Sequence, residues 1–517
     1  MSTGARSTNW TERGTRIVAT NHASSASSIR SIAAILLVGV LLLAPRLGAQ
    51  SLWLDEALTI TPAVTATSLD DLVHRVRAMD TQPPASHLVL YALSDHSPHS
   101  EFFYRLPSFV ALEVGLAVLF LAVRRLWGPS VALVATAIAQ LSPFLAFYGA
   151  EARNYSLWFM LIATSALAAV HWIDAVRTRS PSRWTWALAL ALSNALGLWT
   201  HLFHLFVILA EGVVLVCVAL AEPPGRRAQP LAILAAAETL TVLLFAPWLF
   251  VVMHAASEGT AGVGWTRPFG LGSLAYYLFA AHFGSSLGPD LRSLHAHPLS
   301  QLAGTYAVSL GLAGAAIAVT LVVYALLVRD ALWRPERRWE LLALVVWPVC
   351  ALAGPVAYGW LKSFPLHPRH LMIVWPLLPI VLALGLTRYP RMRPLLAATL
   401  LLQLVALGNL LFDGRYAKDD ERGAVRYAEQ HSTAPGYVIG DVASLYVTRL
   451  EGRPKGFVDF PLGTHDVWLV DNRTWEEQSQ RTRAQLKIRM RAMGMRYDGG
   501  IANFRGIVLR HWTSARS

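Results

Sequence analysis

The stretch SIAAILLVGVLLLAPRLGAQSLWLDEA, residues 31–57, places an apolar run of helical length directly before two adjacent carboxylates. A bilayer core about 30 Å thick requires about 20 apolar residues in a helix, and residues 31–49 meet that length. Arg30 precedes the run and small residues follow it, a pattern that also fits a cleaved signal peptide. Because ten further apolar runs follow, we interpret this one as a retained transmembrane helix.

The same length criterion, applied outward from this stretch, predicts eleven transmembrane helices. The composition agrees, since 54% of the 517 residues are hydrophobic, 15% are charged and the mean hydropathy is +0.43. Such a chain has more apolar surface than a water-soluble core can bury. The predicted spans are 31–49, 102–123, 130–149, 155–176, 184–200, 203–221, 231–252, 303–328, 340–360, 370–387 and 394–412.

The positions of the basic residues predict how the helices are oriented. With a cytoplasmic N-terminus, the inner segments hold 18 basic residues and the longer outer loops hold nine. This is the asymmetry that the positive-inside rule requires. It also accounts for the net charge of +12 without a nucleic-acid partner. We therefore predict a cytoplasmic tail (1–30) and a transmembrane module (31–412) with outer loops at 50–101 and 253–302.

The last segment, 413–517, has the composition of a soluble domain, and an odd number of spans places it outside. Short strands are predicted at 437–441, 467–471 and 506–509, and a polar helix at 474–493. The predicted fold class is an all-α polytopic membrane protein with a small extracytoplasmic α/β domain at its C-terminus.

The first outer loop contains the carboxylates Asp55 and Glu56 directly after the first span. Acidic residues also favour the N-terminus of a following helix, which is the simpler interpretation. The functional interpretation is a general base at the membrane surface, able to take a proton from an acceptor hydroxyl. Asp80 lies three residues before the Pro83-Pro84 pair. It is either a helix cap or a second carboxylate in the same cavity as Asp55.

Three further outer turns contain polar residues. In the turn 148–155, Glu151 and Arg153 either pair with loop neighbours or, in the case of Arg153, hold a phosphate through the planar guanidinium. His201 lies near no Cys or carboxylate spaced for zinc, so we predict no metal site. Arg369 precedes the tenth span, where a cation and the positive end of a helix both favour an anion.

The two cysteines, Cys217 and Cys350, lie in apolar segments and are too few for a disulfide framework or a metal site. The stronger signal is that the polar residues singled out share one side of the membrane. They are Asp55, Glu56, Asp80, Glu151, Arg153, His201, Arg369 and His370.

The order of these motifs resembles the GT-C membrane glycosyltransferases, above all the family 39 type of protein O-mannosyltransferases and lipid A aminoarabinose transferases. The resemblance covers nearly the whole chain, although no single motif is long. The segment Tyr416-Ala417-Lys418-Asp419-Asp420 resembles the start of the C-terminal domain in bacterial members. The other motifs are LWLDEA at 52–57, DxxPP at 80–84, FYRLPS at 103–108, YGAEARNY at 148–155, Thr200-His201, APW at 246–248 and PRHL at 368–371.

The resemblance implies an inverting transfer of a sugar, mannose or similar, from a polyprenyl monophosphate donor. It implies Asp55 as the general base, with Glu56 orienting the acceptor. Arg153 and Arg369 match residues that would hold the phosphate leaving group, where negative charge grows. The remaining substrate-binding candidates are Asp80, Tyr155, His201 and His370.

One departure is His370, where the family commonly has Tyr after the Arg. No cofactor is expected, since arginines can neutralise a monophosphate without a divalent metal. We expect the acceptor to be a glycan, a lipid or a protein, and the location to be a bacterial plasma membrane. A transporter or flippase of lipid-linked sugars is the alternative, but such proteins bind near the midplane and often show internal repeats. A catalytically silent scaffold is a second alternative.

Overall fold

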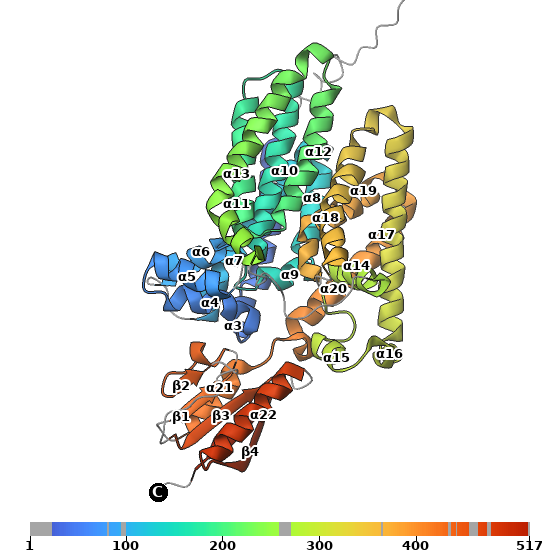
Figure 1. Cartoon of the computed structure of the whole chain (residues 1–517). Coiled ribbons are helices and arrows are strands. Elements are labelled where there is room, and N and C mark those ends of the chain that lie inside the picture. The colour runs from blue at the N-terminus through green and yellow to red at the C-terminus, as the bar shows by residue number, and fades with distance from the viewer. Residues whose placement is uncertain are drawn as a thin grey trace, which may run out of the picture.

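The structure is a computed structural model that describes most of the chain. The described residues are 23–79, 82–94, 100–257, 270–362, 366–432, 436–440, 442–453, 464–472 and 477–514. Figure 1 shows a long bundle of helices with a small sheet domain at one end. We call that end of the bundle the site end and the other the opposite end.

The bundle is built from apolar helices that run between these two ends. They are α2 (Ala23–Leu43), α7 (Glu101–Trp127), α8 (Pro129–Gln140), α9 (Pro143–Gly149), α10 (Tyr155–Arg177), α11 (Arg183–Thr200), α12 (His204–Ala221), α13 (Ala228–Ser257), α17 (Ala307–Trp333), α18 (Trp347–Leu361), α19 (Leu377–Arg388) and α20 (Arg393–Phe412).

Every predicted span contains helix, but the predicted number is not confirmed. Among the described residues, eight helices are long and apolar enough to cross a membrane, or nine if α8 and α9 form one span. Of the others, α11 contains Arg, Ser and Asn within its 18 residues, and α19 has only 12. The chain is a multi-span membrane protein, and eleven spans remain a prediction.

The predicted span 130–149 is bent by 62° between α8 and α9. The local sequence explains the bend. Pro143 is disfavoured within a continuing helix because it lacks an amide N–H and its ring clashes with the preceding turn. Ser142 instead caps α9 by accepting a hydrogen bond from the N–H of Leu145 at 3.4 Å. The bend separates the short α9 from α8 ahead of the turn 150–154.

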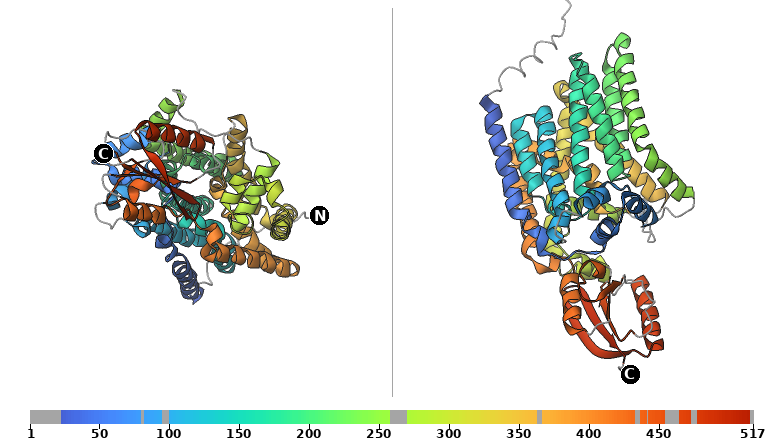
Figure 2. Two further views of the ribbon diagram at one scale, coloured as in Figure 1. Left: turned by 90° about the horizontal axis from the view of Figure 1, so that it is seen from below. Right: turned by 90° about the vertical axis from the view of Figure 1, so that its left-hand side faces the viewer.

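Two groups of short helices lie at the site end, as Figures 1 and 2 show. The first follows α2 and the second follows α13. They are α3 (Arg46–Ala49), α4 (Leu54–Thr65), α5 (Leu69–Met79) and α6 (Ala85–Ser94), and then α14 (Leu271–Phe283), α15 (Leu291–Ala296) and α16 (Leu299–Leu302).

The C-terminal domain is an α/β/α sandwich. Its mixed sheet has the order β2-β1-β3-β5-β4, with β1 parallel to β2 and β3, and β5 antiparallel to β3 and β4. The elements are α21 (Glu421–His431), β1 (Gly436–Ile439), β2 (Glu451–Arg453), β3 (Asp466–Asp471), α22 (Glu477–Ala492), β4 (Arg496–Phe504) and β5 (Ile507–Thr513).

Alternation along β3 explains the two layers of helix. Trp468 and Val470 face α21, whereas Val467 and Leu469 face α22. The three predicted strands and the polar helix are present within a few residues of their predicted positions, and β2 and β4 are additions. The predicted fold class, an all-α polytopic membrane protein with a small C-terminal α/β domain, is confirmed, and the extracytoplasmic position of that domain remains a prediction.

Candidate active site

Four segments that are distant in sequence meet at the site end. They are the first turn of α4, the turn 150–154 between α9 and α10, the 3₁₀ turn η4 (Pro368–Ile373), and the segment before α21 that contains Lys418. Their charged side chains form one continuous network between the helix bundle and the C-terminal domain.

Asp55 lies in the first turn of α4 and keeps a quarter of its side chain exposed. Its Oδ2 accepts a hydrogen bond from Arg369 Nη1 at 2.7 Å. Burial raises the pKa of Asp55, but the opposing effects of the Arg369 and Arg153 guanidinium groups are larger together, so its pKa lies below the ordinary value. Asp55 is therefore an ionised carboxylate with an open side.

Arg153 supports the same turn from the other side. Its Nη1 donates to the carbonyl oxygen of Asp55 at 3.0 Å and to Thr59 Oγ1 at 2.7 Å. Both Arg153 and Arg369 lie over the ring of Tyr155, at 5.7 and 5.6 Å from its centroid. Both guanidinium groups lie near the carboxylate of Asp55, and Arg153 also lies near that of Glu151, so this pair of cations is suited to hold a further anion.

Glu56, the neighbour of Asp55, lies in different surroundings. Its carboxylate is fully buried and accepts two hydrogen bonds from Arg105, at 2.7 and 2.8 Å, and one from Ala152 N–H at 2.9 Å. Lys418 Nζ donates a fourth at 3.0 Å. Burial raises the pKa of Glu56, but Lys418 and Arg105 outweigh it and lower the pKa to about 2. An acceptor cannot reach this carboxylate in the present conformation, because its oxygens are enclosed.

Glu151 and Lys418 complete the buried part of the network. Glu151 is 1% exposed, and its Oε1 lies 3.4 Å from Lys418 Nζ. Burial raises the pKa of Glu151 to about 7, and the carboxylates of Glu56 and Asp55 add to the rise while Lys418 opposes it. Neither Lys418 nor Arg105 was among the predicted site residues. For Arg105 the available signal was a charge within the predicted span 102–123, whereas Lys418 stood out only as part of the motif at 416–420.

His201 and His370 are brought to the same site, with ring centroids 5.8 Å apart. His201 stacks on Trp158 at 4.0 Å, and its Nδ1 accepts the N–H of Phe203 at 3.1 Å. Burial, with Arg369 and Arg153 adding to it, lowers the pKa of His201 to about 3, so this ring is neutral. His370 Nδ1 accepts the N–H of His367 and caps η4.

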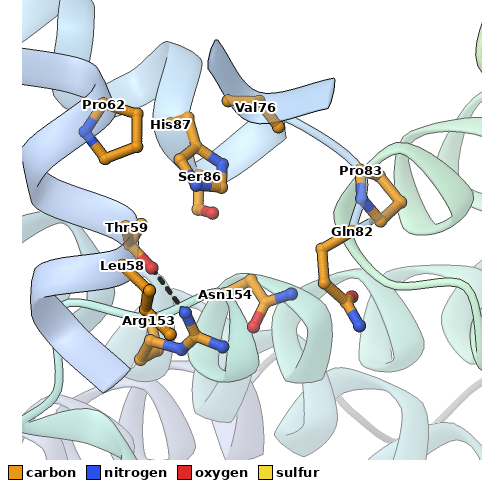
Figure 3. Close-up of a pocket in the computed structure, with 10 residues that line it drawn as sticks. All are labelled: Leu58, Thr59, Pro62, Val76, Gln82, Pro83, Ser86, His87, Arg153 and Asn154. Carbon is orange, nitrogen blue, oxygen red and sulfur yellow. Dashed lines mark hydrogen bonds between the residues drawn. The ribbon is translucent and has the colours of Figure 1, made fainter. Parts of the chain in front are cut away.

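A cavity of about 450 Å³, including its open mouth, lies beside Arg153 (Figure 3). Arg153 and Asn154 line one side of it, opposite Ser86 and His87 from α6. Asp80 was predicted to lie in a cavity with Asp55, but it falls outside the described residues. The other lining residues are Leu58, Thr59, Pro62, Val76, Gln82 and Pro83. Among the residues described, no three His, Cys, Asp or Glu side chains gather as a metal site.

Comparison with known proteins agrees with this architecture. A family model described as dolichyl-phosphate-mannose-protein mannosyltransferase matches residues 82–250. The structure is similar to ArnT from Cupriavidus metallidurans in the apo state, with a TM-score of 0.56 and 13% identity over 95% of this chain and 98% of that one. ArnT bound to undecaprenyl phosphate gives a TM-score of 0.53 and 13% identity over 93% and 97%. No curated protein sequence matches the chain.

At this level of identity the likeness concerns the fold. The predicted resemblance to the GT-C membrane glycosyltransferases is confirmed by the matching family model and by the similar structures together.

Proposed function

We propose that this chain, a membrane protein with the GT-C fold, is an inverting glycosyltransferase that moves a sugar from a polyprenyl monophosphate to an acceptor hydroxyl. The observation that carries the proposal is an ionised carboxylate, Asp55, partly open and held between Arg369 and Arg153 at one end of the bundle. The undecaprenyl phosphate bound by the similar ArnT structure supports a polyprenyl donor here.

Asp55 acts as the general base in this mechanism. It takes the proton of the acceptor hydroxyl as that oxygen forms a bond to the anomeric carbon of the sugar. The bond from the anomeric carbon to the phosphate oxygen breaks on the opposite side, and the polyprenyl phosphate leaves with the electron pair. One displacement of this kind inverts the anomeric configuration.

Arg369 and Arg153 stabilise the leaving phosphate, on which negative charge grows as the bond breaks. Arg369 also links donor binding to the activity of the base. A phosphate that draws the Arg369 guanidinium away from Asp55 removes a hydrogen bond and a charge that lower the pKa of this carboxyl. Asp55 then becomes a stronger base only when the donor is in place.

The remaining predicted residues have supporting roles in this proposal. Tyr155 holds the two guanidinium groups side by side, and the neutral rings of His201 and His370 form a wall near the sugar. Asp80 contributes to substrate binding, and Glu56 fixes the first turn of α4 rather than the acceptor. We place the site on the outer face of a bacterial plasma membrane, with a cytoplasmic N-terminus and the C-terminal domain outside. The sugar is mannose or a similar sugar, and the acceptor is a glycan, a lipid or a protein.

The experiment is transfer from a panel of radiolabelled polyprenyl-phosphate sugars to total membrane acceptors, comparing wild type with Asp55→Asn. We expect label that depends on Asp55 from one donor, while the variant still binds that donor. A folded wild-type protein that gives no Asp55-dependent label from any donor contradicts the proposal. Donor movement across liposomes that survives in Asp55→Asn would favour a flippase instead.

A further inference from the structure

Lys418 lies between the last bundle helix, α20, and the first helix of the C-terminal domain, α21. Its ammonium group enters the bundle and ends between two carboxylates, 3.0 Å from Glu56 Oε2 and 3.4 Å from Glu151 Oε1. The aromatic rings of Trp53 and Phe147 lie 5.3 and 6.0 Å from it. Only 8% of its side chain is exposed.

The use of lysine at this position is unusual for the chain. Of its 44 basic residues only four are lysines, and the others are Lys362, Lys455 and Lys487. Lysine presents a compact charge with three donors, whereas arginine presents a broad planar fork. A narrow site between two carboxylates and two aromatic rings suits the compact group.

The carboxylates that Lys418 contacts connect the two parts of the candidate active site. Glu56 neighbours Asp55 on α4, and its Oε1 accepts the N–H of Ala152, which neighbours Arg153. Glu151 belongs to the same turn as Arg153. The network therefore joins the segment carrying the base to the segment carrying one of the phosphate-binding cations, and Lys418 closes it from the C-terminal domain.

Contacts on both sides of Lys418 hold the segment in place. Lys418 N–H donates to Gln50 Oε1 at 3.2 Å, and Ser51 Oγ donates to Asp420 at 3.1 Å. Further hydrogen bonds and ion pairs continue from the C-terminal domain to the start of α4, to α7 and to the second group of short helices. They are Leu52 N–H to Tyr446 Oη at 2.6 Å, Arg422 to Glu101 at 2.9 Å, and Arg292 to Asp419 at 3.0 Å.

We propose that Lys418 is a positioning residue for the transfer reaction: it neutralises Glu56 and Glu151 from the C-terminal domain and thereby fixes the relative positions of Asp55 and Arg153. The inference rests on the proposed glycosyl transfer and deepens it, because it makes the C-terminal domain part of the catalytic machinery. Lys418 acts through these neighbours and contacts no substrate.

The charges around Lys418 and Glu151 determine how the effect of losing Lys418 depends on pH. Without Lys418, Glu151 stays protonated at low pH but becomes a buried charge that has lost its ion-pair partner once the pH exceeds its pKa, which is about 7 even in the intact network. The defect of a Lys418 variant therefore grows as pH rises. The groups that face Glu151 are Lys418, Glu56, Asp55, Arg153, Arg46, Arg105 and Tyr148, and those that face Lys418 are Glu56, Glu151 and Arg105.

The first experiment measures transfer by Lys418→Met, Lys418→Arg and the double variant Lys418→Met/Glu151→Gln in the full chain. For Lys418→Met we expect kcat to fall about 100-fold, the effect of a small displacement of catalytic groups, with the donor KM near wild type. Lys418→Arg should retain more activity. The double variant should recover part of kcat and lose the growing defect at alkaline pH. Lys487→Met, an exposed lysine of the same domain, is the matched control.

Two results overturn the proposal. One is wild-type kcat and pH dependence in a folded Lys418→Met protein. The other is equal activity of the single and double variants at a pH above the pKa of Glu151, which contradicts the neutralising role. If Lys418→Met does not fold, Lys418→Arg, which keeps the charge in a broader group, should have a lower kcat than Lys487→Met, and an equal kcat in the two variants overturns the proposal.

A second experiment does not require the proposed reaction. Acetylation of wild-type protein with an amine-reactive ester, followed by peptide mass spectrometry, compares Lys418 with Lys362 and Lys487, which are exposed. We expect Lys418 to be protected, and Arg422→Gln, which removes the ion pair to Glu101, to increase its labelling. Rapid labelling of Lys418 in the wild type contradicts its insertion even if transfer is observed. If Lys418 is protected but no transfer is observed, the proposed function is contradicted while the insertion of Lys418 stands.

Discussion

The two ends of the helix bundle both hold clusters of paired charges, but the clusters are built differently. At the opposite end, Arg388 makes two hydrogen bonds of 2.7 Å to Glu340, and Tyr389 donates to Asp330 at 3.0 Å. At the site end, Arg369 and Asp55 also meet at 2.7 Å. The pair chemistry is therefore the same at both ends.

The two ends differ in the sequence separation of the paired residues and in the exposure of the carboxylate. Arg388 and Glu340 are 48 residues apart, whereas Arg369 and Asp55 are 314 apart and Lys418 and Glu56 are 362 apart. Glu340 is 3% exposed, but Asp55 is 25% exposed. Pairs that join nearby helices stabilise the bundle locally. Pairs that join distant segments create a site with an accessible carboxylate.

The largest difference between the two ends should follow from removing one carboxylate at each end. Asp55→Asn should lower kcat about 100- to 10,000-fold, because the general base is lost. Asp330→Asn, which removes a buried carboxylate at the opposite end, should leave kcat near wild type. Transfer assays at saturating donor test both, and a similar loss in the two variants would contradict a catalytic role specific to Asp55.

The cations offer the next comparison. Arg369→Gln should lower kcat about 100- to 1,000-fold, since a group that stabilises the charge on the leaving phosphate is absent. Arg388→Gln should instead lower the thermal midpoint of the protein, because Glu340 is left buried without its partner. An Arg369→Gln variant that changes stability but not kcat would show that Arg369 has a structural role, as expected for Arg388.

Glu56 is expected to behave as a structural residue within the site end. Glu56→Gln leaves Arg105, which is 1% exposed, without its carboxylate, and breaking a buried pair costs about 3–5 kcal/mol. Glu340→Gln should have a comparable cost at the opposite end. Thermal unfolding in lipid nanodiscs compares the two. A stable Glu56→Gln protein with no activity would restore the predicted role of Glu56 in orienting the acceptor.

The smallest expected effect is a change in how stability depends on pH. A carboxyl whose pKa is raised on folding contributes stability that is present below its unfolded value, about 4.5, and is lost as pH rises through its folded value, about 7 for Glu151. Glu151→Gln should therefore flatten the decline in the thermal midpoint across this window. Glu340→Gln serves as the control that should leave the decline in place, and an unchanged slope in Glu151→Gln would show that Glu151 does not titrate there.

Several residues of the site were predictable because the sequence immediately around them marks them as unusual. Asp55, Arg153 and Arg369 are charges placed beside apolar runs, where the cost of desolvation makes a purely incidental charge uncommon. Lys418 was noticed only within a motif, since its exposure and partners depend on the docking of the C-terminal domain. Asp80 remains a prediction because it lies outside the described residues.

Local sequence features were enough to predict a multi-span membrane protein with a small C-terminal α/β domain, because apolar run lengths, the alternation of side chains along strands and the turn residues are local properties. The enclosure of Glu56, the pairing of Asp55 with Arg369 and the insertion of Lys418 became visible only in the folded structure. These features depend on segments hundreds of residues apart approaching within hydrogen-bond distance. Local patterns in a single sequence do not reveal which of several arginines meets which carboxylate.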